Sequence, residues 1–267
     1  MLSRARWTPA AGVPTARTAL LVTLLVTLLL GCTTEPIPEE PGPLAGAELS
    51  VLFIGNSLTY ANFLPNLVQT VAEAAGHTLA RRVHAWPGYS LEDHWQNGGE
   101  AVVLDARAEF VVLQQGPSSL PENQAHLATW AATFAPAIRE AGGEPALFMV
   151  WPSRGRADAF DAVRDSYQAA AEAVDGLFIP AGEAWREVWR QDADIELYGG
   201  DGFHPEHLGS LVAALTIYAV LSGEDVRDLP DVLEPTSPDM PTITLPPELG
   251  ALIREAVHQT VTDWPAR

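Results

Sequence analysis

The chain has 267 residues and a formal net charge of −19, from 34 acidic residues against 15 arginines and no lysine. Its hydrophobic fraction of 47% excludes a disordered or collagen-like chain, and its length suits one large domain or at most two small ones. The acidity argues against a nucleic-acid partner, because an acidic surface repels phosphates. The single cysteine excludes an intramolecular disulfide and a multi-thiolate metal site.

The first 31 residues are typical of a targeting segment. Three arginines precede an apolar run of about a dozen residues, which is short for a membrane span. The sequence Leu29-Leu30-Gly31-Cys32 resembles the signal of bacterial lipoproteins, in which the cysteine is lipidated. The resemblance implies a signal peptide over 1–31, lipidation of Cys32 and attachment to a membrane of the bacterial cell envelope. An ordinary secretory signal or a buried core cysteine is the alternative.

Residues 32–48 are rich in proline and glutamate. A segment of this composition cannot build a core and is expected to be semi-extended. We therefore predict a tether over 32–48 that carries a folded domain over 49–267.

From residue 49 onward, short apolar runs alternate with helical patterns. Buried strands are predicted at 50–54, 78–85, 110–113, 146–151 and 177–180. Helices are predicted at 63–75, 122–140 with a kink or break at Pro136, 157–174, 182–190, 206–221 and 248–264, and the proline-rich segment 229–247 is expected to wrap the surface. Short strands separated by helices predict a parallel sheet covered on both faces, and hence one three-layer α/β domain.

A hydroxyl follows the first predicted strand, in the sequence Gly55-Asn56-Ser57-Leu58-Thr59. Ligands of open α/β sheets bind beyond the carboxyl ends of the strands, and the amides at the start of the next helix favour negative charge. Ser57 is therefore a candidate nucleophile. The alternative is that Ser57 or Thr59 only caps that helix.

A second candidate group is Asp201-Gly202-Phe203-His204-Pro205. A serine hydroxyl is a weak nucleophile until a base takes its proton, and histidine is the commonest base. An acid three residues before the histidine can fold back onto the imidazole Nδ1, which leaves Nε2 facing a nucleophile. The pattern is weak alone and gains weight beside a serine that follows a strand.

These two blocks resemble the SGNH/GDSL hydrolase superfamily, in which a Gly-Asp-Ser opens the domain and an Asp-x-x-His closes it; this chain has Asn56 in place of the Asp. The resemblance covers most of residues 49–225. It implies a flavodoxin-like three-layer fold, with Ser57 as nucleophile, His204 as base and Asp201 as the residue that orients the base.

The family's middle blocks supply an oxyanion hole. Gly88, after the second strand, matches the family glycine whose amide joins the Ser57 amide in that hole. The third donor is normally an asparagine in Gly-x-Asn-Asp, which this chain lacks after its third strand. Gln114 is the first choice to replace it and Gln115 the second, because a glutamine amide can donate the same hydrogen bond.

Other residues at the strand ends have two interpretations each. Glu183 either lines the same cleft or forms a helix cap or ion pair. Trp86, Trp95 and Trp151 are either half-buried core or platforms that stack on sugar rings.

The resemblance thus implies a serine esterase that acts on small-molecule or glycan acyl esters, with acetyl groups as one option, while held at a membrane by its lipid anchor. No metal and no cofactor are expected. Two alternatives stay open: an O-acyltransferase on the same triad, and a surface-binding lipoprotein that has lost catalysis.

Overall fold

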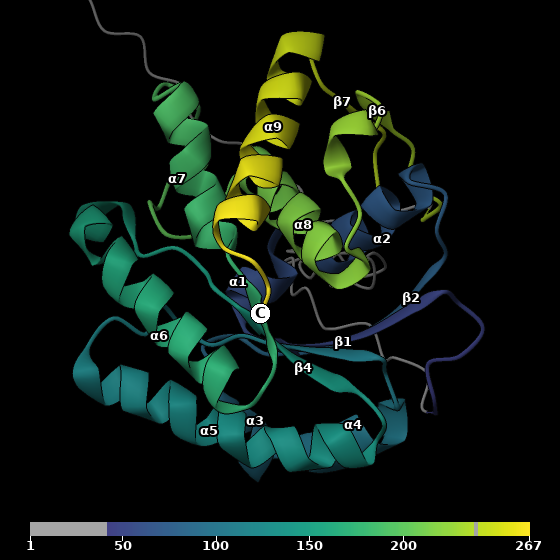
Figure 1. Cartoon of the computed structure of the whole chain (residues 1–267), viewed down its shortest axis with the longest axis vertical. Helices are drawn as coiled ribbons and strands as arrows, with labels where there is room; N and C mark the ends of the chain where they lie inside the picture. The colour runs from purple at the N-terminus through teal and green to yellow at the C-terminus, as the bar shows by residue number, and fades with distance from the viewer. Residues whose placement is uncertain (1–41, 238–239) are drawn as a thin grey trace, which may run out of the picture. The chain divides into compact units, whose positions relative to one another are not determined.

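The computed structural model describes residues 42–237 and 240–267. The predicted signal peptide, Cys32 and the first part of the predicted tether lie outside these residues. The described chain confirms the predicted α/β class, with a parallel five-stranded sheet between two layers of helices (Figure 1). No helix in this part of the chain is both long and apolar enough to cross a bilayer.

The sheet has the strand order β2-β1-β3-β4-β5, and every neighbouring pair is parallel. Its strands are β1 Leu49–Gly55, β2 Leu79–Ala85, β3 Phe110–Leu113, β4 Glu144–Phe148 and β5 Leu177–Ile179. This is the flavodoxin-like order, in which successive strands are added on one side of β1 and then, from β3 onward, on its other side. Polar residues that follow these two strands therefore lie at the position where such sheets bind ligands.

Helices cover both faces of the sheet. They are α1 Ser57–Tyr60, α2 Leu64–Ala74, α3 Leu91–Gln96, α4 Gly99–Ala106, α5 Pro121–Glu140, α6 Phe160–Ala173, α7 Ala181–Gln191, α8 His207–Ser222 and α9 Pro247–Asp263. Helices α2, α7, α8 and α9 form one layer, and α3 to α6 form the other (Figure 1). Beyond α8, the short strands β6 Val232–Leu233 and β7 Ile243–Thr244 pair antiparallel in the segment that was expected to wrap the surface.

One predicted strand boundary is wrong, and a break in one predicted helix does not occur. The fourth strand ends at Phe148, whereas the apolar run continues to Trp151, because the Met149 carbonyl accepts a hydrogen bond from Gly182 at the start of α7. Helix α5 runs through Pro136 without a break. An interior proline removes one backbone hydrogen bond, and the buried face of this 20-residue helix compensates for that loss.

The predicted tether is too long at its carboxyl end. The backbone N–H of Leu44 donates to the Ala106 carbonyl at 2.7 Å, and that of Gly42 donates to the Asp105 carboxylate at 2.8 Å. Leu44 also packs against the hydrophobic core. Residues 42–48 are therefore part of the folded domain, which does not begin at residue 49 as predicted.

The far end of the chain covers one edge of the sheet. In the edge strand β5, the backbone N–H of Phe178 donates to the Ala266 carbonyl at 3.0 Å. The residues after α9 thus return to the sheet.

A buried histidine supports the carboxyl end of β1. His94, on α3, is inaccessible to solvent, and its Nε2 donates to the Gly55 carbonyl at 2.7 Å. Burial lowers the pKa of His94 to about 4, although the bond to Gly55 acts in the opposite direction. The His84 ring lies 5.1 Å away between centroids, and burial lowers its pKa as well. The fold therefore requires a neutral imidazole at position 94.

We predict that this imidazole makes the protein sensitive to acid. The unfolded chain binds a proton at His94 near pH 6.5 and the folded chain only near pH 4. The unfolded state thus holds more protons between these values, and unfolding free energy should fall by up to about 3 kcal/mol as the pH drops from 6.5 to 4. Urea denaturation at several pH values measures this slope. His94→Gln should flatten it and the exposed-site control His207→Gln should not; an unchanged slope in His94→Gln would refute the assignment.

Candidate active site

The candidate nucleophile lies in a tight turn after β1. Asn56 caps α1, because its Oδ1 accepts a hydrogen bond from the Leu58 N–H at 3.1 Å. Ser57 is the first residue of that helix. A Cβ at Gly55 would collide with the Thr59 hydroxyl and the Gln114 amide oxygen, so only glycine fits before the turn. The close packing around Gly55 fixes where the Ser57 hydroxyl emerges.

The candidate base lies on the loop before α8. Residues Tyr198 and Pro205 form an antiparallel bridge that closes this loop. Within it, the Asp201 Oδ1 accepts hydrogen bonds from the N–H groups of Phe203 and His204, both at 2.9 Å. Gly202 has φ +68°, a left-handed conformation that glycine adopts without strain. The loop therefore folds the carboxylate back toward its own histidine.

The structure brings Ser57, His204 and Asp201 together. The imidazole Nδ1 of His204 lies 2.6 Å from the Asp201 Oδ2, and Nε2 lies 2.9 Å from the Ser57 Oγ. Because a carboxylate can only accept, Nδ1 carries the proton and Nε2 offers its lone pair to the serine hydroxyl. Ser57 and His204 are 147 positions apart in the sequence. This geometry can activate a hydroxyl for attack on a carbonyl carbon.

Asp201 stays ionised over a wide pH range. The hydrogen bond from His204 and those from the backbone lower the pKa of its carboxyl to about 2. Its side chain is half exposed, so water screens part of this interaction. The carboxylate is available to hold the imidazole at any pH above about 3.

Two backbone N–H groups are free to stabilise an oxyanion. Within the described chain, no hydrogen bond uses the N–H of Ser57 or of Gly88. Gly88 has φ +72° in an exposed turn, and no atom lies within 4 Å of the position that a Cβ would take. Open space above this backbone leaves room for a substrate oxygen.

The two glutamines do not match the oxyanion role predicted for them. Gln114 has no exposed surface; its Oε1 accepts from the Asn56 N–H at 2.9 Å and from the Thr59 hydroxyl at 2.7 Å. Its amide nitrogen donates to the Gln115 carbonyl. Gln115 is also buried, and its amide nitrogen donates to Ser118 at 2.9 Å. In this conformation both amides join β3 to its surroundings and neither is open to a substrate.

The remaining strand-end residues have structural roles. Trp151 is fully buried, stacks on Trp185 at 3.6 Å between centroids, and donates its indole N–H to the Phe203 carbonyl at 3.0 Å. Trp95 packs edge-on against Phe134. The Trp86 side chain is 39% exposed, and the backbone N–H of this residue donates to the Gly55 carbonyl at 3.1 Å. Of the three, Trp86 alone presents a substantial ring surface to solvent near the nucleophile turn.

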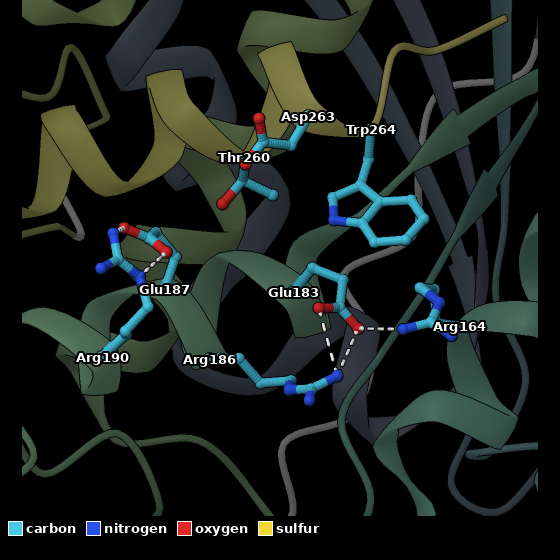
Figure 2. A pocket seen from close by; sticks show the side chains of 8 residues that line it. All are labelled: Arg164, Glu183, Arg186, Glu187, Arg190, Thr260, Asp263 and Trp264. Carbon is cyan, nitrogen blue, oxygen red and sulfur yellow. Dashed lines mark hydrogen bonds and ion pairs between the residues drawn. The ribbon is translucent and has the colours of Figure 1, made fainter.

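Glu183 takes part in ion pairs and not in the triad. It lines a pocket of about 430 Å³ between α6, α7 and α9 (Figure 2). Its carboxylate lies 3.2 Å from Arg186 and 3.9 Å from Arg164. Burial raises the pKa of Glu183, and the neighbouring arginines oppose that rise. The charges in this pocket neutralise one another, which favours a structural ion-pair network.

A groove of about 960 Å³ adjoins the base loop. The side chains of Arg154, Glu196 and Glu206 line it together with Asp201. Arg154 pairs with Glu196 at 2.7 Å, and its guanidinium lies over the Tyr198 ring. The groove therefore combines charged side chains with apolar surface.

Sequence reasoning missed several residues that hold the site. Asn56 donates its amide to the Tyr89 carbonyl at 3.0 Å, which binds the nucleophile turn to the loop after β2. The His94 imidazole donates to the Gly55 carbonyl, and the Trp151 indole donates to the Phe203 carbonyl. The motif block contains Asn56 and Trp151 was noted at a strand end, but the sequence gives no signal of these contacts, because each one reaches a backbone group that is distant in sequence.

Comparison with known proteins agrees with this geometry. No family model matches the chain, and no curated protein matches it. Among solved structures, a protein from Slackia heliotrinireducens described as a candidate SGNH hydrolase is 29% identical, with a TM-score of 0.53 over 64% of this chain and 97% of that one.

Two more distant structures share the fold. A DUF4886 family protein from Bacteroides uniformis is 19% identical, with a TM-score of 0.65 over 82% of this chain and 96% of that one. A catalytic mutant of an acetylxylan esterase from Geobacillus stearothermophilus is 16% identical, with a TM-score of 0.51 over 65% of this chain and 94% of that one. These structures support the resemblance read from the sequence: the α/β domain of this chain is similar in fold to SGNH/GDSL hydrolases and esterases of known structure.

Proposed function

We propose that this protein is a serine esterase that hydrolyses acyl esters of small molecules or glycans through Ser57, His204 and Asp201, while lipidated Cys32 holds it at a membrane of the bacterial cell envelope. The observation that carries the catalytic part is the pair of hydrogen bonds that joins the Ser57 hydroxyl to His204 Nε2 and His204 Nδ1 to Asp201. The anchoring part rests on the lipoprotein-like signal that ends at Cys32.

The reaction proceeds by two acyl transfers. His204 Nε2 takes the Ser57 proton as Oγ attacks the ester carbonyl, and Asp201 stabilises the imidazolium that forms. The Ser57 and Gly88 amides donate to the oxyanion. His204 then gives its proton to the leaving alcohol, and an acyl-serine remains. Water, deprotonated by the same imidazole, then attacks the acyl-serine; the bond to Ser57 Oγ breaks, His204 returns the proton to Oγ, and the acid is released.

The groove beside Asp201 suggests the nature of the alcohol. Its lining contains positively and negatively charged side chains, together with the backbone of Gly199, Gly200 and Gly202. These charged and backbone groups can form hydrogen bonds with an alcohol that carries several hydroxyl groups. An acylated sugar is therefore the favoured substrate.

We predict that Ser57→Ala abolishes ester hydrolysis. Removal of the nucleophile should lower kcat for p-nitrophenyl acetate by about 10³-fold or more, since the acyl-enzyme cannot form. The control Ser222→Ala removes a hydroxyl at the opposite end of α8, where it donates to the Tyr218 carbonyl, and should keep parental activity. Equal rates in Ser57→Ala and the parent would reject the esterase and favour a binding protein. If acetyl groups pass to an added sugar faster than to water, the protein is an O-acyltransferase and not an esterase.

Asp201→Asn should lower kcat by about 10²- to 10⁴-fold and leave the fold intact. The amide oxygen can still accept from the Phe203 and His204 N–H groups, whereas the amide nitrogen would face His204 Nδ1 and favour the tautomer protonated on Nε2. That tautomer cannot accept the serine proton. Steady-state kinetics together with the circular dichroism spectrum test this; parental kcat in a folded Asp201→Asn variant would contradict the assigned role of Asp201.

The anchor has its own test. In a bacterial host that processes lipoproteins, the full chain should partition into the detergent phase of Triton X-114, and Cys32→Ser should move it to the aqueous phase. Esterase activity of the two forms should be the same, because Cys32 takes no part in the triad. Aqueous partitioning of the unaltered chain would rule out lipidation.

A further inference from the structure

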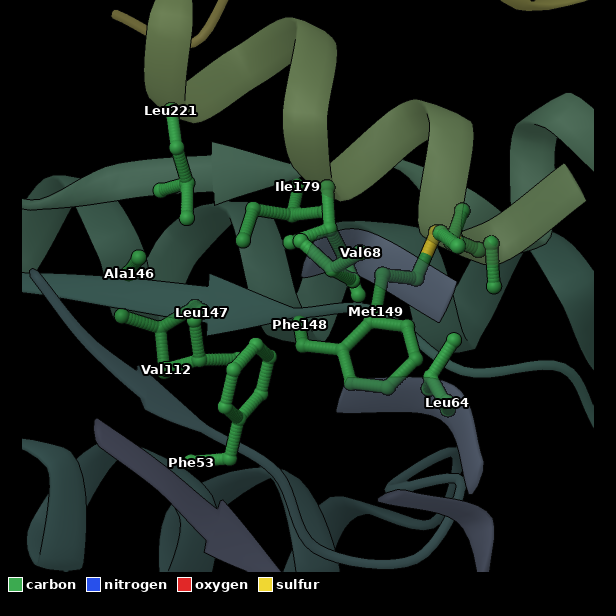
Figure 3. Packing of buried hydrophobic residues seen from close by; sticks show 14 of the residues in the cluster. Phe53, Leu64, Val68, Val112, Ala146, Leu147, Phe148, Met149, Ile179 and Leu221 are labelled. Carbon is green, nitrogen blue, oxygen red and sulfur yellow. The ribbon is translucent and has the colours of Figure 1, made fainter. Parts of the chain in front are cut away.

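An unusual turn follows the nucleophile helix. Asn62 and Phe63 both have left-handed backbones, with φ +52° and +58°. Asparagine adopts this region readily, whereas a bulky aromatic residue rarely does, so the backbone at Phe63 is strained. Phe63 is 54% exposed, so contacts of its ring do not explain why the turn persists. Leu64 and Val68 just after the turn are buried in the core cluster that includes Phe148 and Met149 (Figure 3).

The Asn62 side chain binds the base loop directly. Its amide nitrogen donates to the Pro205 carbonyl at 2.8 Å and to the Ser210 hydroxyl at 2.9 Å. Pro205 follows His204, and Ser210 lies in the first turn of α8. Both protons of the amide are thus used on residues more than 140 positions away in the sequence.

The base loop is held through four consecutive carbonyls. Gly202 accepts from the Arg154 N–H, Phe203 from the Trp151 indole and His204 from the Gly199 N–H. The fourth, Pro205, accepts from Asn62. The first three donors come from the segment after β4 or from the base loop itself. Asn62 alone comes from the segment that carries Ser57.

We propose that Asn62 is a positioning residue that fixes His204 relative to Ser57, a role that rests on the proposed esterase function. The hydrogen bond between Ser57 and His204 breaks in every cycle as the proton leaves the hydroxyl. The bonds from Asn62 involve no titrating atom and persist through the cycle. A shift of about 1 Å between reacting groups can cost about 10²-fold in rate. Asn62 therefore keeps the imidazole in reach while its bond to the serine is absent.

The test compares variants that remove the two donors in different ways. Asn62→Asp is isosteric and keeps the left-handed backbone preference, yet its carboxylate cannot donate to the Pro205 carbonyl. Asn62→Gly accepts φ +52° without strain and removes the side chain. Each should lower kcat for p-nitrophenyl acetate by about 10-fold or more with KM within about twofold of the parent. The control Asn66→Asp makes the same charge change four residues later and should keep parental kinetics.

Ser210→Ala removes one acceptor without altering the turn, and a smaller loss in kcat is expected. If an Asn62 variant does not fold, Ser210→Ala still tests whether the hydrogen bonds of the Asn62 side chain affect kcat. Parental kcat in folded Asn62→Asp and Asn62→Gly, or a loss no larger than the fall in folded protein measured by thermal melting, would overturn the proposal. Ser57→Ala separates the two hypotheses: an inactive Ser57→Ala with a fully active Asn62→Asp refutes the positioning role alone, whereas an active Ser57→Ala refutes the esterase itself.

Discussion

Lack of space around Gly55 is the constraint on which the site depends. Its Cα lies against the Thr59 hydroxyl and the Gln114 amide, and its carbonyl accepts from the Trp86 N–H and the His94 imidazole. Groups from α1, β3, α3 and the loop after β2 therefore converge on one residue. A buried backbone that is bonded on every side has few alternative conformations. The rigidity of this point gives the following serine a defined direction.

Much of the fold could be predicted from the sequence because the strands are short, apolar and buried on both faces. Residues such as Phe53, Val112 and Leu147 lie in the sheet where the hydrophobic runs placed them. Prediction failed where burial and secondary structure separate. Met149 to Trp151 are as buried as the strand before them, yet they do not pair as a strand. A hydrophobic run indicates which residues are buried, but it does not indicate which group each backbone amide bonds.

The candidate site divides in the same way. Ser57, Asp201 and His204 could be picked out because their chemistry and their places at strand ends are visible in the sequence. Gln114 was assigned the wrong environment, because its orientation depends on the hydrogen bonds that it accepts from Asn56 and Thr59. Asn62 gave no signal at all: an asparagine before a helix is common, and its partners lie across the fold. Residues that act by holding a distant backbone become visible only in three dimensions.

The bond between Phe178 and Ala266 has a consequence for how the molecule behaves when crowded. An edge strand with open amides can pair with a strand of another chain and start aggregation. At β5 the Ala266 carbonyl occupies the Phe178 N–H, and at the opposite edge the guanidinium of Arg82 on β2 pairs with Asp105 and donates to the Gly42 carbonyl. Segments outside the sheet thus bind both of its border strands, one through a backbone hydrogen bond and one through an ion pair.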